Sequence, residues 1–170
     1  PSSPTWDVAA PHYSVDAQTL PLNVSEGTWM NLDVSPDGRH IAFDMLGDIY
    51  QLPISGGKAE PLLSGHAWEI QPQYSPDGRF LAFTSDRNGA DNIWVMDLSN
   101  PGNKQQITHE TFRLLNNPNW HPSGNYLVAK KHFTTSRSLG TGEVWLYDAN
   151  IDAGIARENL SGSVLVERPS

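Results

Sequence analysis

The sequence contains no cysteine, few basic residues and no long hydrophobic run, and each absence excludes a class of protein. Without cysteine, the chain of 170 residues has no disulfide, no thiolate metal site and no cysteine nucleophile. Its 11 lysines and arginines against 19 aspartates and glutamates give a net charge of −8, which repels a nucleic-acid backbone. No apolar run approaches the roughly 18 residues of a spanning helix. We therefore expect no nucleic-acid partner and no membrane span.

Motifs of the common catalytic and cofactor sites are absent as well. The sequence has no G-x-S-x-G nucleophile turn and no glycine-rich phosphate loop of the G-x-G-x-x-G or P-loop type. Its six histidines lack the i, i+4 or His-x-His spacing of a zinc site. The sequence thus predicts no catalytic residue, no cofactor-binding residue and no metal ligand in this segment.

What the sequence does contain is one phrase written three times. SPDGRHIAF begins at Ser35, SPDGRFLAF at Ser75, and a divergent copy, HPSGNYLVA, at His121. A second phrase follows each copy: DIYQLP, NIWVMD and EVWLYD. With an approach segment before each turn and a closing segment at the end, every unit has four short β-like stretches. Units of this kind with a period of about 40–50 residues are typical of four-stranded propeller blades.

The repeat predicts an all-β protein: a partial β-propeller of about three four-stranded blades plus an orphan N-terminal strand. The orphan, QTLPLNV, resembles the closing strand of a preceding blade. Because propellers typically need about four to eight blades to close, we expect the chain to be a segment of a longer protein, or two copies to complete a ring by self-association. The expected boundaries are 1–27 for the N-terminal segment, 28–65, 66–109 and 110–162 for the three blades, and 163–170 for a tail or the start of a further blade.

The Ser-Pro-Asp-Gly phrase has a mechanical explanation. Serine favours the first position of a tight turn, proline sets φ to about −65° at the second, and glycine accepts positive φ at the end. We interpret the phrase as architecture, the same hairpin made three times, and not as chemistry. The aromatic residue shared by the three units, at Tyr50, Trp94 and Trp145, is predicted to pack between blades. The turn residues are Pro36, Asp37, Gly38, Pro76, Asp77, Gly78, Pro122 and Gly124.

The units differ most in the connection between their second and third strands, which lengthens along the chain. In the third unit it reads KKHFTTSRSLGTGE, a concentration of basic residues in an otherwise acidic protein. Such a loop is either a solvated hairpin tip or an interface or anion-binding loop. The candidate interface residues are Lys130, Lys131, His132, Arg137 and Glu143.

The units SPDGRHIAF…DIYQLPISGG and SPDGRFLAFTSDRNGADNIWVMDLS resemble the TolB-like, or PD-type, β-propeller repeats, from Thr28 to about Gly162. The third copy departs from that pattern, with Ser123 in place of aspartate. Longer phrases, among them EGTWMNLDVSPDG, TFRLLNNPNW and KKHFTTSRSLGTGEVWLYD, look like the N-terminal propeller of secreted bacterial amidohydrolases. This resemblance implies a periplasmic or secreted parent hydrolase that acts on C–N bonds. Its zinc-type divalent metal would belong to a separate barrel domain and not to this segment.

Three functions are compatible with this resemblance. The first is an accessory, non-catalytic propeller that docks on the hydrolase domain of the same polypeptide. The second is a stand-alone TolB-like scaffold that holds envelope proteins in the periplasm. The third is the propeller of a dipeptidyl-peptidase-type serine hydrolase, whose chain would continue into an α/β-hydrolase domain with a G-x-S-x-G motif.

Overall fold

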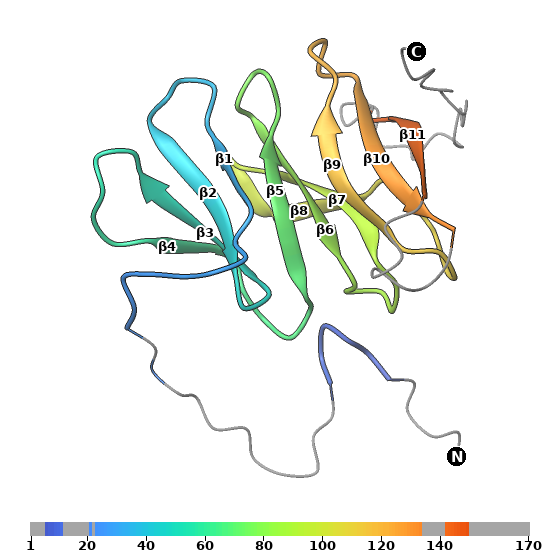
Figure 1. Ribbon diagram of the computed structural model, residues 1–170, viewed down its shortest axis with the longest axis horizontal. Coiled ribbons are helices and arrows are strands. Elements are labelled where there is room, and N and C mark those ends of the chain that lie inside the picture. Colours follow the sequence, from blue (N-terminus) through green and yellow to red (C-terminus); the bar gives the residue numbers. More distant parts are fainter. Residues whose placement is uncertain (1–5, 12–20, 22, 134–141, 150–170) are drawn as a thin grey trace, which may run out of the picture.

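The computed structural model describes residues 6–11, 21, 23–133 and 142–149, and every regular element within these ranges is a β-strand. The described strands form three separate antiparallel sheets that fan out side by side (Figure 1). This confirms the predicted all-β class and the open, partial propeller. In the described part of the chain, no helix has the length and apolar character needed to cross a membrane.

Each sheet contains one copy of the repeat, and its strands pair in chain order; we call the sheets blade 1, blade 2 and blade 3. Within the described residues blade 3 has three strands. Its predicted fourth strand (158–162) lies outside them, as does most of the orphan strand predicted at 18–24. The strands are β1 (Leu32–Val34), β2 (His40–Met45), β3 (Asp48–Pro53) and β4 (Glu60–Leu63) in blade 1; β5 (Glu69–Tyr74), β6 (Phe80–Ser85), β7 (Asn92–Asp97) and β8 (Asn100–Gln106) in blade 2; and β9 (Leu115–Trp120), β10 (Tyr126–His132) and β11 (Gly142–Asp148) in blade 3.

The repeated phrase forms the turn between the first and second strands of each blade. Gly38, Gly78 and Gly124 have φ angles of 70°, 71° and 76°. Each donates its backbone N–H to the carbonyl three positions earlier, at 2.8, 2.9 and 2.9 Å respectively. The left-handed backbone is the reason for glycine at these three positions, because a side chain there would be strained.

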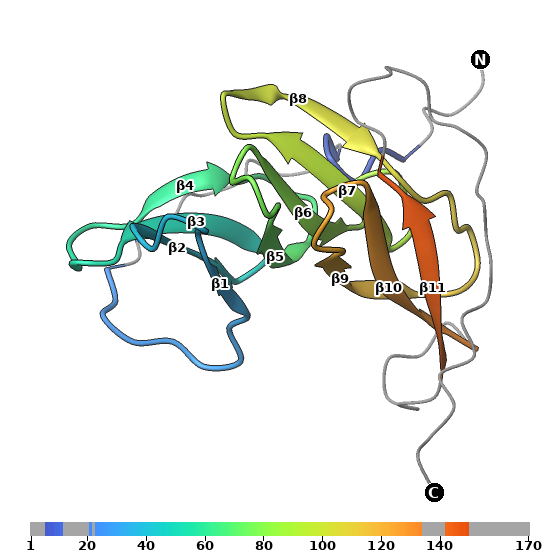
Figure 2. The ribbon, with the colours of Figure 1, turned by 90° about the horizontal axis from the view of Figure 1, so that it is seen from above.

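Blade 2 lies between blades 1 and 3 (Figure 2) and is buried on both faces. Every residue of β6 is buried, and its side chains alternate between two hydrophobic cores. Leu81 and Phe83 belong to the core shared with blade 1, whereas Phe80 and Ala82 belong to the core shared with blade 3. Burial on both sides is what an uninterrupted apolar run predicts, because such a strand has no solvent-facing side.

The shared aromatic residue is half-buried in each blade. Trp94 packs against the core between blades 1 and 2, and Trp145 against the core between blades 2 and 3. Each of the two tryptophan rings has a cation above it. Arg87 Cζ lies 5.1 Å from the Trp94 ring centroid, and Lys131 Nζ lies 4.4 Å from the Trp145 ring centroid. The aromatic side chains therefore contribute packing and hold a charged neighbour.

Candidate functional site

The three copies of the repeat also differ where neighbouring blades meet. We call the contact of blades 1 and 2 the first junction and the contact of blades 2 and 3 the second junction. At both, the first strands of the two blades lie beside each other, β1 beside β5 and β5 beside β9. The two junctions bring together equivalent strands that carry different side chains. A difference between the junctions can therefore be assigned to particular residues.

Two carboxylates join the blades at the first junction. Asp44, near the end of β2 and 3% exposed, accepts hydrogen bonds from the backbone N of Gln71 at 2.7 Å and from Asn31. The Asn31 bonds come from its backbone N at 2.9 Å and its side-chain Nδ2 at 2.7 Å. Asp33 accepts a bond from the backbone N of Tyr74 at 2.8 Å. Blade 1 thus supplies charged acceptors to backbone donors of blade 2, and charge-assisted bonds of this kind are the stronger ones.

Neutral groups make the corresponding contacts at the second junction. Gln71 Oε1 accepts hydrogen bonds from the backbone N of Asn117 at 2.8 Å and from Thr84 Oγ1 at 3.0 Å. Trp120 Nε1 donates to the carbonyl of Gln73 at 3.1 Å. Thr84 follows Leu-Ala-Phe in blade 2, as the aspartate of the first junction follows Ile-Ala-Phe in blade 1. Threonine thus stands in blade 2 where blade 1 has the aspartate, and Gln71 supplies the acceptor to the next blade instead.

A strained backbone position recurs next to these contacts. Gln71 and Asn117 have φ angles of 60° and 56° at equivalent places of blades 2 and 3. A left-handed backbone costs a residue with a side chain about 1–3 kcal/mol. Because an acceptor of the preceding blade bonds the backbone N–H of each of these two residues, the strain is maintained by the junctions. Its recurrence in blades 2 and 3 marks it as part of the architecture.

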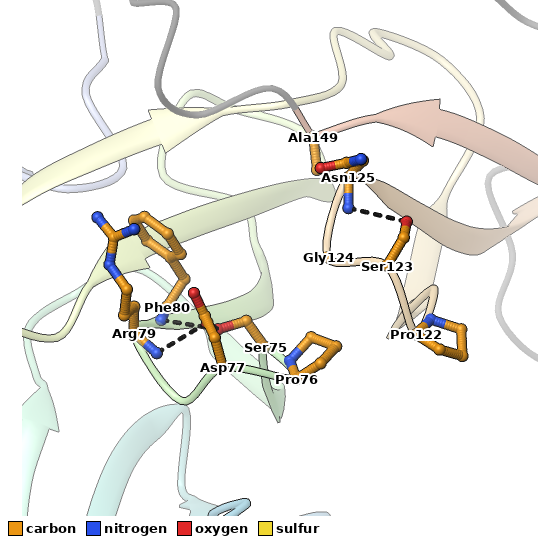
Figure 3. Close-up of a pocket in the computed structure, with 10 residues that line it drawn as sticks. All are labelled: Ser75, Pro76, Asp77, Arg79, Phe80, Pro122, Ser123, Gly124, Asn125 and Ala149. Atoms are coloured by element: carbon orange, nitrogen blue, oxygen red, sulfur yellow. Dashed lines mark hydrogen bonds between the residues drawn. The ribbon is translucent and has the colours of Figure 1, made fainter.

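The turns of neighbouring blades are close together at the first junction and apart at the second. A β-carbon on Gly78 would lie 3.6 Å from Cδ of Pro36, whereas a β-carbon on Gly124 would meet nothing within 4 Å. The second junction accordingly contains a recess of about 340 Å³ between the turns of blades 2 and 3 (Figure 3). Within the part of the chain that the structure describes, we take this recess as the candidate binding site.

The recess has a mixed lining, with polar groups on both walls. Phe80 and Ala149, which are 8% and 2% exposed, belong to its apolar part. Arg79 lies over the Phe80 ring, with its Cζ 4.9 Å from the centroid. The two walls are the turn residues Ser75, Pro76 and Asp77 of blade 2 and Pro122, Ser123 and Asn125 of blade 3.

Asp77 is the carboxylate of the recess. Burial raises the pKa of Asp77, but hydrogen bonds from Ser75 Oγ at 2.6 Å and from the backbone N of Arg79 at 3.0 Å outweigh that effect and hold the pKa below its ordinary value. Asp77 is therefore ionised at neutral pH. On the opposite wall the third copy of the turn has Ser123 in place of the aspartate, with its Oγ 2.9 Å from Nδ1 of His121. The charged residues among those that line the recess, Asp77 and Arg79, thus both come from blade 2.

Blades 2 and 3 each have an ion pair beside the shared tryptophan. Glu69, 2% exposed, pairs with Arg87, and Glu110 pairs with Lys131. Burial raises the pKa of Glu69, and the neighbouring Arg87 opposes the rise. These four charged side chains are engaged in contacts within the propeller.

The predicted loop residues Lys130, Lys131 and His132 lie in strand β10 and not in the connection after it. Strand pairing with β11 continues to the last of them, with Lys130, Lys131 and His132 opposite Val144, Glu143 and Gly142. Lys131 pairs with Glu110, and His132 is 3% exposed with its Nε2 3.1 Å from Asn116 Oδ1. The expected start of the loop at residue 130 was wrong, and the interface role of these residues stays a prediction.

The other two candidate interface residues have different outcomes. Arg137 lies outside the described residues. Glu143 lies at the start of β11, where its Oε2 accepts a hydrogen bond from Nε1 of Trp145 at 2.9 Å. Within the described residues, no group of three or more histidines, aspartates or glutamates is placed to hold a metal ion.

Reasoning from the sequence missed Asp44, Gln71 and the recess. A signal for Asp44 was present, because a carboxylate directly follows the apolar Ile-Ala-Phe of a buried strand and must be paired there. The recess had no such signal, since it depends on the spacing between two turns that are far apart in the chain.

The comparisons with known proteins agree with the propeller fold. The family model of the TolB beta propeller domain matches residues 22–170. The chain belongs to the TolB β-propeller family. This TolB-type propeller is similar to the solved structure of TolB from Agrobacterium tumefaciens, with a TM-score of 0.59 and 28% identity over 68% of this chain and 44% of that one.

Two curated relatives of the propeller are longer proteins. An uncharacterized protein of Agrobacterium fabrum (strain C58) is 39% identical over 64 residues, which are 35% of this chain and 22% of the relative. Tricorn protease homolog 1 of Streptomyces coelicolor is 32% identical over 74 residues, which are 44% of this chain and 7% of the relative. The chain thus covers less than a quarter of either relative.

Proposed function

We propose that this propeller is a non-catalytic module of a larger periplasmic or secreted hydrolase, against whose other parts it packs. The outer face of blade 1 carries the proposal. Leu32 and Val34 are 57% and 43% exposed and pair across β1 and β2 with Phe43 and Ile41. Phe43 also stacks on Tyr50, with ring centroids 5.7 Å apart. These five side chains form a continuous apolar face.

The equivalent face of blade 2 is covered by a neighbouring blade. Leu81 and Phe83 occupy in blade 2 the positions of Ile41 and Phe43, and both are fully buried under blade 1. An exposed apolar face of this kind is typical of a contact surface, because burying it is favourable by about 25 cal/mol per Å². The partner that we propose for it is a further part of the same polypeptide.

The finer proposal is that the parent protein is a metal-dependent amidohydrolase. It is supported by the phrases EGTWMNLDVSPDG, TFRLLNNPNW and KKHFTTSRSLGTGEVWLYD, which resemble the propeller of secreted amidohydrolases. In that case the divalent metal and the catalytic residues belong to the barrel domain, and the propeller shapes access to it or docks upon it. The periplasmic or secreted location is part of the same proposal.

Two relatives favour alternatives. The Streptomyces relative, named as a tricorn protease homolog, favours the propeller of a peptidase. The TolB structure from Agrobacterium tumefaciens favours a stand-alone scaffold that binds envelope proteins. The whole natural protein separates these three cases: a metal chelator inactivates an amidohydrolase, a serine-directed reagent inactivates a serine peptidase, and a scaffold hydrolyses neither an amide nor a peptide substrate.

Docking itself is tested by expressing the propeller and the remainder of its natural polypeptide as two separate chains. We expect them to elute together in size-exclusion chromatography, and we expect Leu32→Lys to prevent this by placing a charge in the apolar face. Phe112→Lys is the matched control, because Phe112 is 70% exposed and lies in blade 3's approach segment. Separate elution of the unmodified chains, or equal behaviour of the two variants, would contradict docking through blade 1.

A further inference from the structure

We propose that the recess at the second junction binds an arginine side chain on an extended segment of a partner protein. The site is separate from the outer face of blade 1 and goes beyond the docking described above. It arises where two copies of the same turn stop touching: Pro36 closes on Gly78 at the first junction, and nothing closes on Gly124 at the second. The contact between turns that fills this place at the first junction is missing at the second, and its absence leaves a space.

The polar groups of the recess are suited to a cation with several donors. Asp77 offers a carboxylate from blade 2, and across the recess Ser123 and Asn125 offer a hydroxyl and an amide from blade 3 (Figure 3). A guanidinium group carries five N–H donors in a planar fork that matches a carboxylate and neighbouring neutral acceptors. Lysine presents a point charge and lacks this match.

The apolar groups of the recess are suited to the rest of an arginine side chain. Pro76 and Pro122 line the two walls, so methylene groups that enter between the turns pass along their rings. The volume of about 340 Å³ is at the lower end of ligand pockets, which span about 300–1,000 Å³. Such a space admits one side chain with its adjoining peptide units and excludes a folded domain.

The overall charge favours a cationic ligand over an anionic one. The chain carries a net charge of −8, which attracts basic segments and repels acidic ones. The one cation that lines the recess, Arg79, stacks on the Phe80 ring at 4.9 Å. A ligand that preferred Arg79 would be acidic, and an acidic peptide is therefore included as an arm of the test.

Binding is measured by NMR titration of the isotope-labelled 170-residue chain with the peptide acetyl-Gly-Arg-Gly-amide. Saturable shifts of the backbone amides of Ser123 and Asn125 are expected. The same peptide with citrulline, a neutral isostere of arginine, should bind about tenfold or more weakly, because its bond to the carboxylate loses the charge. Equal affinity for citrulline, tighter binding of acetyl-Gly-Asp-Gly-amide, or shifts confined to other residues would overturn the proposal.

The repeat provides a matched pair of variants. Asp37 makes the same bonds to Ser35 Oγ and to the backbone N of Arg39 as Asp77 makes in its own turn, but it does not line this recess. Asp77→Asn should weaken binding of the arginine peptide by about tenfold or more, and Asp37→Asn should leave it unchanged. Equal weakening by both variants would mean that binding responds to the loss of any turn carboxylate and not to the one in the recess, and the proposal would be wrong.

A third variant fills the space without touching the carboxylate. Ser123 is exposed at the tip of the third turn, so Ser123→Tyr places a ring in the mouth of the recess while the fold is kept. We expect this variant to lose binding and to keep the thermal unfolding midpoint of the parent. Unchanged binding by a folded Ser123→Tyr protein would show that the peptide binds elsewhere.

Discussion

The two junctions of this propeller bring together the same strands, yet one is closed by charged groups and the other is left open at its turns. At the first, Asp44 and Asp33 bond to the backbone of blade 2, and Pro36 lies against Gly78. At the second, an amide replaces the carboxylates, and a recess separates the turns. The comparison teaches that the copies of the repeat build architecture where they agree and a candidate site where they differ.

The largest effect is expected from the cores of the two junctions. Phe83→Ala empties the fully buried position at the first junction and should lower the free energy of unfolding by about 3–5 kcal/mol. Phe80→Ala, on the same strand but in the core of the second junction, should cost slightly less because its ring is 8% exposed. Urea denaturation measures both values.

Hydrogen exchange then shows whether the two junctions are separate. Phe83→Ala should accelerate exchange of the Gln71 amide, which bonds across the first junction, and Phe80→Ala that of the Asn117 amide, which bonds across the second. If each variant affected both amides equally, the blades would unfold as one unit and the distinction between junctions would not hold for stability.

A smaller effect is expected from the polar connection of the first junction. Asp44→Ala leaves the backbone N of Gln71 and the side chain of Asn31 without their acceptor, which should cost about 3 kcal/mol. The equivalent change in blade 2, Thr84→Ala, removes one neutral hydrogen bond and should cost about 1 kcal/mol. Chemical denaturation of the two variants side by side measures the difference, and equal costs would contradict the assignment of a stronger first junction.

Substitutions in the turns should show a smaller difference in stability between the two junctions. Gly78→Val should destabilise the protein by about 1–3 kcal/mol, because a β-branched residue resists a φ angle of 71°. Gly124→Val meets the same backbone strain but no neighbouring turn, so we expect it to cost less than Gly78→Val, whose side chain also meets Pro36. Thermal unfolding of the pair checks the order, and a larger loss for Gly124→Val would indicate that the recess is occupied in solution.

The smallest effect concerns pH. Glu69 lies at the first junction, where its backbone N donates to the carbonyl of Gly47 at 2.8 Å, and burial raises the pKa of its carboxyl group above the ordinary value of 4.5. The folded state therefore holds this proton more tightly than the unfolded state. The contribution of Glu69 to stability is fully present below pH 4.5 and falls as the pH rises through the raised folded value.

The variant Glu69→Gln does not titrate, so the difference in unfolding free energy between parent and variant should change in that pH window and be constant above it. Glu60→Gln is a suitable control, because the Glu60 side chain is 67% exposed and pairs with exposed Lys58. Denaturation in urea at a series of pH values measures both differences. A parent-to-variant difference for Glu69→Gln that does not depend on pH would show that its pKa is not raised.

Local features of this protein could be predicted from its sequence, and features that depend on strand extension could not. The turns at Gly38, Gly78 and Gly124 have the expected positive φ because proline and glycine act within four residues. The burial of β6 on both faces also follows from its own residues. In contrast, Lys130 and His132 were expected in a loop, and they lie in β10 because the pairing strand β11 continues opposite them.

By itself the sequence determined the all-β class, the three hairpins and the family, because a repeated phrase with defined turn chemistry imposes the same local structure each time. Only the tertiary structure decided which junction is closed and which is open. That depends on Asp44 meeting the backbone of Gln71, and on the distance between turns that lie about one repeat apart along the chain. Distances between segments so far apart are set by the packing of whole blades, which no short stretch of residues encodes.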